Sequence, residues 1–369
     1  MRSWDSVRAQ ALGFDIGRLS QARNLCQSTT DSGAIPGVCL VVARHGEQVL
    51  NEAWGRADRA GTPATPETVW LIASVTKPIV CLGLCLLLER GLLGLDDPVH
   101  RHLPEFSGED RRAVTLRHLL THTSGLPDML PENLELRQRH ALLSEFVERI
   151  CSTPLLFAPG TNVHYQSTGI ALIGEIVARI SGKSCPEFLR DELLSPLGMA
   201  STSLGWVPGL AGMVAECFQA DESPATDWDW NSYYWRGFGA PWGGMFASAP
   251  EIARVMQLML QDGAWNSRQV LSSATVREAT RNQTDLLPDL SRSARLRASW
   301  GLGWRVLAAR ESEYFGDLLS PVAYGHAGAT GTGVWNDPET GVTFVLFTNR
   351  ANSGRFIGLV SNAVAAAVL

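Results

Sequence analysis

The chain has 369 residues, 45% of them hydrophobic and 18% charged, which is long enough and apolar enough for two to three globular units with a large core. Its formal net charge of −6, without a run of basic residues, excludes the electrostatic footprint of a nucleic-acid-binding protein. The longest apolar stretch (78–88) is too short to span a bilayer, the N-terminus lacks a signal-peptide core and the seven cysteines fit reduced thiols, so we expect a soluble, cytoplasmic protein without a membrane partner.

The first 95 residues carry alternating helix and strand signals. The expected elements are a helix over 15–32, a hairpin with strands over 38–44 and 48–54 and its turn at His45-Gly46, and a helix from about Ser74 to Gly91. A Thr/Pro-rich link over 62–66 separates the hairpin from this second helix, and Gly91 suits the position just after a helix end.

Beyond residue 95 the pattern changes to short helices and loops, and strands return after residue 297. The expected elements are helices over 115–122, 142–150, 168–180, 186–194 and 248–261, strands over 300–308, 332–336 and 342–349, and a last helix at the C-terminus. Thr115 is an expected N-cap, and Ser248 with Glu251 an expected capping box. Strands at both ends predict one α/β domain made from residues 1–94 and 263–369, interrupted by a mostly helical insert over 95–262.

The segment Ser74-Val-Thr-Lys77 pairs a hydroxyl with an amine at the start of the second helix. Residues three apart lie on one helix face, and side chains lean toward the N-terminus, so the Lys77 amine is aimed at the Ser74 hydroxyl. The partial positive charge of a helix N-terminus disfavours an ammonium there and favours the neutral amine that a general base must be. The spacing therefore predicts a nucleophile with its base.

Lysine is rare in this chain, which contains only Lys77 and Lys183 among 31 Lys and Arg residues. Arginine cannot lose its proton in a protein and so cannot serve as a base. The placement of one of two lysines three residues after a serine favours catalysis over coincidence.

Two further motifs offer polar groups. Tyr165 lies in a loop that opens the expected helix over 168–180, and a phenol near a lysine can shuttle a proton. Residues 324–333 are rich in glycine at a strand start, where N–H groups can point into a site. Taken alone, Tyr165 could be a packing residue and the glycine-rich segment a tight turn.

Two other patterns are ambiguous. His118 and His122 have the spacing of a metal pair on a helix, but leucine follows His118 in place of the glutamate of His-Glu-x-x-His, so we expect no metal. The aromatic stretch 206–242, which includes Trp235 and Trp242, could form a lid or pocket wall, a loop stapled to the core, or an oligomer contact.

Together these motifs resemble the serine hydrolases that share a fold with class C β-lactamases and DD-peptidases, and most of all their family VIII carboxylesterase branch. The matching segments, in order, are Ser74-Val-Thr-Lys77, 118–127, Tyr165-Gln-Ser167, 181–199, 243–248, His326-Ala-Gly328 and 346–350. The resemblance implies a β-lactamase/transpeptidase-like fold: an antiparallel sheet flanked by helices, formed from both chain ends, with the active site in the cleft beside the helical insert.

The resemblance also implies a covalent mechanism without a cofactor. Ser74 would attack a carbonyl while Lys77 and Tyr165 share its proton, with either one as the base. The backbone N–H groups of Ser74 and Ala329 would form the oxyanion hole, and water would release the acyl group.

Departures from the β-lactamase pattern bear on the substrate. This chain has Tyr165-Gln-Ser167 where those enzymes usually have Tyr-x-Asn, and His326-Ala-Gly328 where they usually have Lys-Thr-Gly. A site without that cation and hydroxyl should bind anionic β-lactams poorly, although His326 could still offer one hydrogen bond. We therefore expect a carboxylesterase for small or aryl esters, with Ser167, His326, Gly328, Trp235 and Trp242 as candidate substrate-binding residues.

Three alternatives remain open from the sequence. The same residues could serve a β-lactamase, a D-amino-acid peptidase or amidase, or an acyltransferase. A non-catalytic scaffold that kept the fold is a further possibility, which the joint presence of Ser74, Lys77 and Tyr165 argues against. The expected partner is a small-molecule ester, and the sequence leaves the oligomeric state open.

Overall fold

The structure is a computed structural model that describes residues 3–210, 212–219, 224–307 and 313–369. Its main element is an antiparallel sheet with the strand order β1-β3-β2-β13-β12-β11-β10-β9. The strands are β1 (Ser3–Trp4), β2 (Gly37–Arg44), β3 (Glu47–Gly55), β9 (Ser299–Trp300), β10 (Arg305–Val306), β11 (Tyr324–Gly328), β12 (Thr332–Asp337) and β13 (Val342–Thr348). The antiparallel sheet expected from both chain ends is therefore confirmed.

The N-terminal and C-terminal strands meet in the middle of this sheet. Strand β2 pairs with β13 from Val38 opposite Thr348 to Arg44 opposite Val342. The β2–β3 hairpin turns at His45 and Gly46, which both have positive φ, as a type I′ turn requires. The hairpin prediction is confirmed; the turn pairs Arg44 with Glu47, and the register then shifts between Ala43 and Val42.

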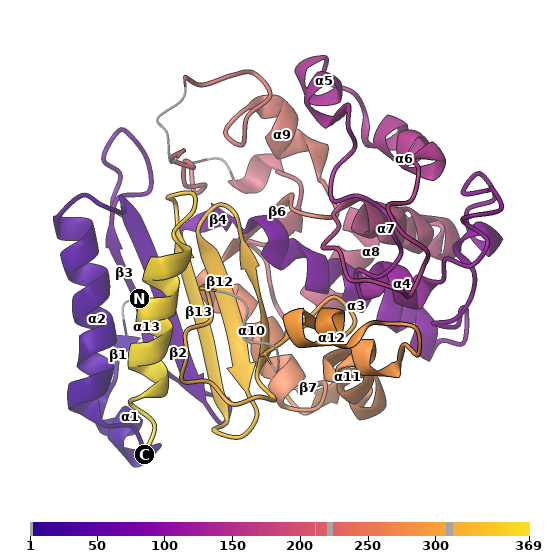
Figure 1. Ribbon diagram of the computed structural model, residues 1–369. Coiled ribbons are helices and arrows are strands. Elements are labelled where there is room, and N and C mark those ends of the chain that lie inside the picture. Colours follow the sequence, from indigo (N-terminus) through magenta and orange to yellow (C-terminus); the bar gives the residue numbers. More distant parts are fainter. Residues whose placement is uncertain (1–2, 211, 220–223, 308–312) are drawn as a thin grey trace.

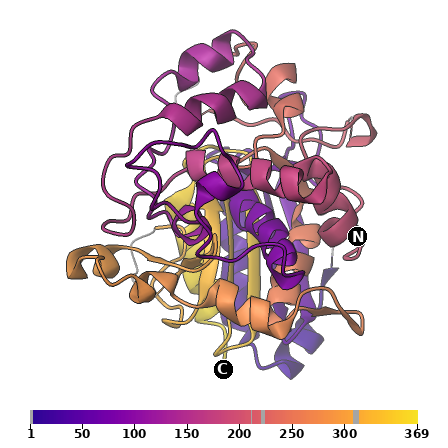
Figure 2. The same ribbon diagram turned by 90° about the vertical axis from the view of Figure 1, so that its right-hand side faces the viewer.

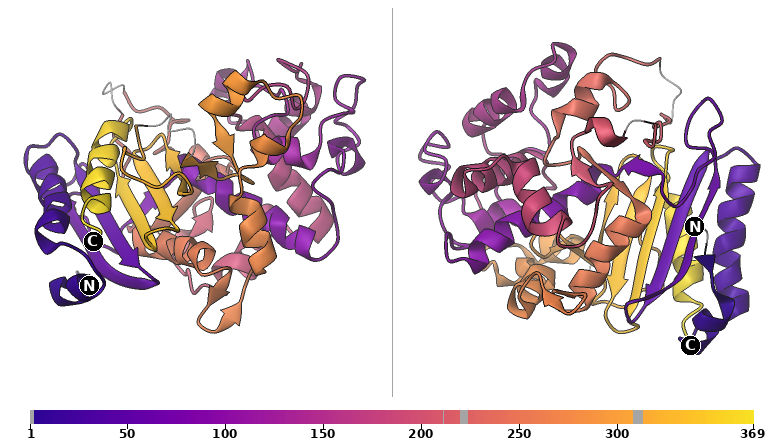
Figure 3. Two further views of the ribbon diagram at one scale, coloured as in Figure 1. Left: turned by 60° about the horizontal axis from the view of Figure 1, so that its bottom comes forward. Right: turned by 180° about the vertical axis from the view of Figure 1, so that it is seen from behind.

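Helices cover both faces of the sheet. Helices α2 (Ile16–Asp31) and α13 (Gly354–Ala365) pack together on one face, and α10 (Ala249–Leu260) packs on the opposite face against β13 and β2 (Figure 1; Figure 3, right). Alternate residues of β2 accordingly belong to different cores: Leu40 and Val42 to that of α2 and α13, Val41 to that of α10. Because both faces of β2 are covered, its residues 38–43 are all apolar and buried.

The helical part lies beside the sheet, on the side away from α2 and α13 (Figures 1 and 2). Its α-helices are α4 (Leu116–Leu120), α5 (Asn133–Gln138), α6 (Leu143–Ser152), α7 (Thr168–Ser181), α8 (Cys185–Leu189) and α9 (Tyr233–Phe238). Helix α3 (Thr76–Glu89) is the buried link between the two parts, since it packs against α7 and α8 while its preceding turn touches β11.

Short elements complete the structure. A second sheet contains β4 (Val69–Leu71), β6 (Met245–Ser248) and β5 (Ser203–Leu204), and a small hairpin contains β7 (Ala264–Trp265) and β8 (Arg268–Gln269). The remaining helices are α1 (Ser6–Ala11), α11 (Ser273–Thr280), α12 (Arg292–Arg297) and the short turns η1 (Ala73–Val75), η2 (Val99–Arg101), η3 (Arg190–Leu194), η4 (Pro208–Leu210) and η5 (Gln283–Leu286). Within the described part of the chain, no helix combines the length and apolarity needed to cross a membrane.

Several sequence expectations need correction. Ser248 is the N-cap residue of α10, but its side chain makes no capping hydrogen bond. The Glu251 carboxylate accepts hydrogen bonds from Ser201 N and Thr202 Oγ1 in place of the Ser248 N–H, so the predicted capping box is wrong. The helix expected over 186–194 is divided between α8 and the π-helical turn η3. The strand expected over 300–308 is two short strands, β9 and β10, and residue 308 lies outside the described residues.

The proposed division into an α/β domain and an insert stays a prediction. Helix α10 falls within the expected insert (95–262) but packs on the main sheet, whereas α3 falls within the expected α/β domain but packs on α7. The two parts therefore share their cores at these helices.

Candidate active site

Ser74 and Lys77 lie at the junction of η1 and α3. Ser74 is in the 3₁₀ turn, one residue after Ala73, which has a positive φ of 44°. Lys77 is the second residue of α3, and its Nζ lies 2.9 Å from Ser74 Oγ. The tight 3₁₀ turn brings residues three apart together, so the two side chains meet although Ser74 precedes the α-helix.

The Lys77 amine is surrounded by protein. Its Nζ donates to the carbonyl oxygen of Trp242 at 2.8 Å and lies 4.8 Å from the centre of the Tyr165 ring. Burial lowers the pKa of Lys77 to about 7, although the nearby Asp128 carboxylate acts in the opposite direction. A substantial fraction of the amine is therefore neutral at neutral pH.

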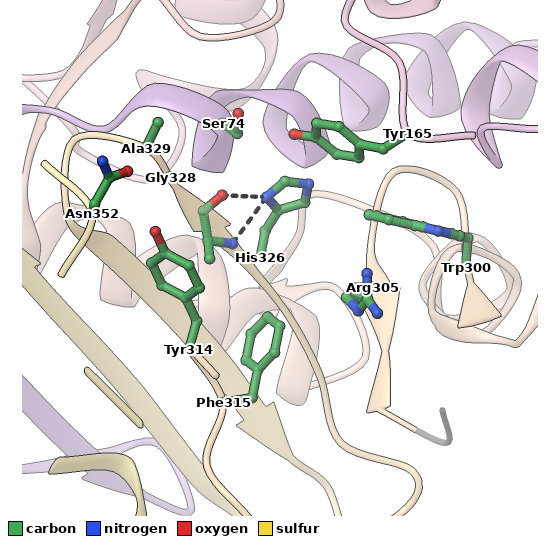
Figure 4. A pocket seen from close by; sticks show the side chains of 11 residues that line it. Ser74, Tyr165, Trp300, Arg305, Tyr314, Phe315, His326, Gly328, Ala329 and Asn352 are labelled. Atoms are coloured by element: carbon green, nitrogen blue, oxygen red, sulfur yellow. Dashed lines mark hydrogen bonds between the residues drawn. The ribbon is translucent and has the colours of Figure 1, made fainter. Parts of the chain in front are cut away.

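Tyr165 is the second side chain that reaches Ser74, after Lys77. It lies in the loop that precedes α7, and its hydroxyl points toward Ser74 (Figure 4). Burial raises the pKa of Tyr165 above its ordinary value, and the interaction with the Ser74 side chain only partly offsets this effect. The phenol thus keeps its proton at neutral pH.

The end of β11 lies directly against the backbone that precedes Ser74. A Cβ atom on Gly328 would be 2.4 Å from the Ile72 carbonyl oxygen and 2.3 Å from Thr332 Oγ1, so only glycine fits this approach. Thr332 Oγ1 also donates to the Ile72 carbonyl oxygen at 2.8 Å. These contacts hold Ala329, the next residue, beside Ser74 at the cavity that both line (Figure 4).

A cavity of about 300 Å³ opens at Ser74. Its lining residues are Ser74, Tyr165, Trp300, Arg305, Tyr314, Phe315, His326, Ala327, Gly328, Ala329 and Asn352. Sequence reasoning missed five of them, namely Trp300, Arg305, Tyr314, Phe315 and Asn352. They are scattered over more than 50 residues without a shared motif, so the sequence gives no signal that they converge.

His326 contributes a neutral ring to this cavity. Its Nδ1 lies 2.9 Å from the Ala327 carbonyl oxygen, to which a protonated Nδ1 donates, and 3.0 Å from the Ala327 nitrogen, whose N–H an unprotonated Nδ1 accepts (Figure 4). Burial lowers the pKa of His326 to about 3, and the charge of Lys77 acts in the same direction. The buried Nε2 has no partner among the described residues, so it is available to hydrogen-bond a bound molecule, as an acceptor when Nδ1 carries the proton and as a donor when it does not.

The other three candidate substrate-binding residues lie outside the cavity lining. The Ser167 backbone N–H donates to Asp128 Oδ1 at 2.8 Å, and Trp242 contributes its carbonyl to Lys77. Trp235 is buried with its ring 4.3 Å from the guanidinium of Arg137. A role in substrate binding for Ser167, Trp235 and Trp242 stays a prediction.

The aromatic stretch 206–242 packs against the helical part. Phe238 packs against Phe146 of α6 at 5.1 Å between ring centres, and Tyr234 Oη donates to the Ala141 carbonyl oxygen at 2.9 Å. None of the cavity-lining residues comes from this stretch, of which residues 211 and 220–223 lie outside the described residues.

The possible metal pair is not assembled. Helix α4 ends at Leu120, so His118 and His122 do not share a helix face, contrary to the sequence expectation. His118 completes a capping box with Thr115, and His122 is fully buried beside Tyr165. Over the described ranges, no group of three or more His, Cys, Asp or Glu residues could hold a metal ion.

Comparison with known proteins adds an independent line of evidence. Residues 22–367 match the sequence model of the family described as "Beta-lactamase". A protein of Escherichia coli (strain K12) named "Putative D-alanyl-D-alanine carboxypeptidase" is 29% identical over 380 residues, covering 92% of this chain and 84% of its own. Esterase EstB of Burkholderia gladioli is 40% identical over 181 residues, covering 44% of this chain and 45% of EstB.

A solved structure resembles the whole chain. The crystal structure of a family VIII carboxylesterase superimposes with a TM-score of 0.77 at 20% identity, covering 94% of this chain and 97% of the other. At this identity the likeness shows a shared fold, which agrees with the fold expected from the sequence motifs.

Proposed function

The chain belongs to the beta-lactamase family of serine hydrolases, and we propose that within this family it is a carboxylesterase acting on small or aryl esters. The observation that carries the proposal is the Lys77 amine, which lies 2.9 Å from Ser74 Oγ beside an aromatic-lined cavity. The similarity to Esterase EstB supports ester hydrolysis.

In the acylation step, Ser74 Oγ attacks the ester carbonyl carbon and its proton passes to neutral Lys77 Nζ. The lowered pKa of Lys77 supports its role as the base, because a base is most effective when its pKa is near the operating pH. Donation of an N–H to the Trp242 carbonyl orients the amine so that its lone pair can face Ser74.

The negative charge that develops on the carbonyl oxygen would be stabilised by the backbone N–H groups of Ser74 and Ala329. Both residues line the cavity at the point where Oγ would attack, which supports this assignment. The close packing of Gly328 against Ile72 holds the two segments at a fixed separation.

Collapse of the tetrahedral intermediate releases the alcohol and leaves an acyl group on Ser74. Tyr165 donates its phenolic proton to the leaving oxygen and regains a proton from the Lys77 ammonium, which is thereby neutral again. The raised pKa of Tyr165 supports this donor role over a role as the base. Water then attacks the acyl carbon, Lys77 accepts its proton, and Ser74 leaves with a proton as the carboxylic acid is released.

The cavity supports the choice of substrate class. Trp300, Tyr314 and Phe315 supply apolar ring surface suited to an aryl or short alkyl group. His326 is neutral and offers one unpartnered ring nitrogen, Nε2, which suits an uncharged ester better than an anionic substrate.

One observation favours a second candidate, a D-amino-acid carboxypeptidase. Arg305 lines the cavity, and a guanidinium binds a carboxylate in bidentate geometry, as the C-terminus of a peptide substrate would require. The similarity to the Escherichia coli relative over 92% of this chain supports the same candidate.

A substrate panel tests the two candidates. The purified chain is assayed with p-nitrophenyl acetate and butyrate, nitrocefin and a peptide ending in D-alanyl-D-alanine, with Ser74→Ala as the control. We expect Ser74-dependent ester turnover, with little cleavage of nitrocefin or peptide. Peptide cleavage that exceeds ester turnover and is lost in Arg305→Gln would overturn the esterase proposal in favour of the carboxypeptidase.

A further inference from the structure

His122 is a fully buried residue that the mechanism above does not use. It follows α4 and adopts a left-handed backbone conformation with φ of 60°. Asn, Asp and His tolerate this backbone conformation better than most other residues with a side chain. The backbone alone therefore does not single out histidine at this position, and the contacts of its ring must.

Three contacts connect His122 with Tyr165 and its chain neighbours. The His122 carbonyl oxygen accepts the N–H of His164 at 2.9 Å, and its Nδ1 accepts the N–H of Gln166 at 3.1 Å. The imidazole lies 4.8 Å from the Tyr165 ring, centre to centre. The residues on both sides of Tyr165 are therefore hydrogen-bonded to one histidine, whose ring also packs on the phenol.

The arrangement specifies the protonation state of His122. Since Nδ1 accepts a hydrogen bond, the proton of the neutral ring is on Nε2, which has no acceptor among the described residues. Burial and the nearby Lys77 lower the pKa of His122 well below its ordinary value, so the ring keeps this form. A protonated ring would place a second N–H against that of Gln166.

The imidazole also contacts the cavity wall. Its ring lies 4.2 Å from that of Trp300, at an angle of 75°, and Trp300 lines the cavity beside Tyr165. His122 thus lies between two aromatic residues of the site without touching the cavity itself.

We propose that His122 is a positioning residue that holds the Tyr165 phenol at the leaving-group oxygen, mainly through acceptance of the Gln166 N–H by its Nδ1. The inference rests on the proposed function, in which Tyr165 protonates the leaving alcohol. Without the acceptor, Gln166 keeps its side-chain hydrogen bond to the Leu119 carbonyl oxygen, but the backbone next to Tyr165 loses its bond to His122, and the phenol spends less time in reach of the leaving-group oxygen. A merely structural histidine would affect folding and all substrates alike.

Leaving-group dependence separates these two roles. Nitrophenolate leaves readily without a proton, whereas the alkoxide of an ethyl ester is strongly basic and needs general-acid help. The experiment compares kcat for p-nitrophenyl butyrate and ethyl butyrate in the wild type, Tyr165→Phe, His122→Gly and His122→Asn, with the thermal midpoint of each protein recorded.

The two His122 variants form a matched pair. Glycine and asparagine both tolerate φ of 60°, but only asparagine supplies an oxygen at the place of Nδ1 to accept the Gln166 N–H. Should His122→Gly fail to fold, His122→Leu fills the space with the shape of asparagine and no acceptor, and the same comparison applies.

We expect Tyr165→Phe to lower kcat on ethyl butyrate about 100-fold more than on p-nitrophenyl butyrate, a general-acid-sized effect. In His122→Gly, the ratio of kcat on ethyl butyrate to kcat on p-nitrophenyl butyrate should fall at least about 10-fold, one tenth of the change in Tyr165→Phe. In His122→Asn, this ratio should return to within about threefold of the wild-type value. An unchanged ratio in His122→Gly, or a ratio in His122→Asn as altered as in the glycine variant, would overturn the inference. Loss of all ester turnover in the wild type would instead overturn the proposed function.

Discussion

The amine of Lys77 donates to the main-chain carbonyl of Trp242, 165 residues further along the chain, at 2.8 Å. This hydrogen bond connects the first turn of α3 with the segment that leads into β6, and the amine is also 2.9 Å from Ser74. A neutral amine can donate to the carbonyl and still accept from the serine hydroxyl, whereas an ammonium has no lone pair to accept with. In the proposed mechanism, the protonation state of Lys77 therefore determines whether the site is active.

The first prediction concerns the pH dependence of ester hydrolysis. Because the pKa of Lys77 is lowered to about 7 and the neutral form is the base, kcat/KM should rise with pH through about 7 and then level off. In Lys77→Arg, kcat/KM should be at least about 1,000-fold lower and should no longer rise with pH, since a guanidinium stays protonated. Initial rates between pH 5 and about pH 9 measure both; a wild-type profile that is flat across this range would contradict the assignment of Lys77 as the base.

The same shift predicts a dependence of stability on pH. The folded-state pKa of Lys77 is below the ordinary value of 10.5, so the unfolded chain binds more protons between these two values. Burial of Lys77 therefore destabilises the fold most at or below pH 7, and this penalty decreases by up to about 1.4 kcal/mol per pH unit as the pH rises toward 10.

Lys77→Met removes this penalty while filling the same space. Its stability advantage over the wild type, measured by urea unfolding, should be largest near pH 6 to roughly 7 and should shrink toward roughly pH 9. An advantage that stays constant over this range would show that the lysine is not forced toward its neutral form by burial.

The third prediction concerns the approach of β11 to the Ser74 segment. Gly328→Ala would place a Cβ 2.4 Å from the Ile72 carbonyl oxygen, and this oxygen belongs to the backbone and cannot move alone. We expect the separation of Ser74 and Ala329 to change and kcat to fall at least about 100-fold, the size of an oxyanion-hole loss. Gly209→Ala is the matched control, since a Cβ there meets nothing within 4 Å. Equal kcat values for the two alanine variants would refute the prediction.

The fourth prediction concerns Glu251, whose carboxylate is buried. It accepts hydrogen bonds from Ser201 N at 3.1 Å and Thr202 Oγ1 at 2.6 Å, which connects α10 to the segment before β5. Glu251→Ala should lower the free energy of unfolding by about 2 kcal/mol, because two donors lose their acceptor in the interior. The exposed Glu148 of α6 provides the control, and Glu148→Ala should change the free energy of unfolding by less than about 0.5 kcal/mol. Similar values for both variants, measured by urea unfolding, would show that the buried hydrogen bonds are not stabilising.

Much of the fold could be predicted from local patterns. The hairpin turn at His45-Gly46, the helix that carries Lys77 and the strands at both chain ends follow from periodicity and turn residues, which are local properties. The contact of Ser74 with Lys77 was also predictable, because helical spacing brings residues three apart together whether the first turn is α or 3₁₀.

Other parts of the site depend on long-range packing. The Trp242 carbonyl is a main-chain atom, so the identity of its residue gives no indication that it binds Lys77. Arg305 and Phe315 reach the cavity because the chain returns to the sheet beside β11. No sequence pattern predicts that these two residues line the same cavity. The aromatic density over 206–242 is compatible with a lid or pocket wall, a loop packed on the core, or an oligomer contact, and only the tertiary structure shows that Phe238 and Trp242 pack on Phe146 of α6.

In the proposed mechanism, Ser74 forms a covalent acyl intermediate with Lys77 as its base. Intact-protein and peptide mass spectrometry after reaction with a fluorophosphonate probe tests this directly, with Ser74→Ala and Lys77→Arg in parallel. We expect one adduct per chain, located on Ser74, absent in Ser74→Ala and formed far more slowly in Lys77→Arg. An unlabelled wild-type chain, or an adduct on another residue, would show that Ser74 is not the nucleophile.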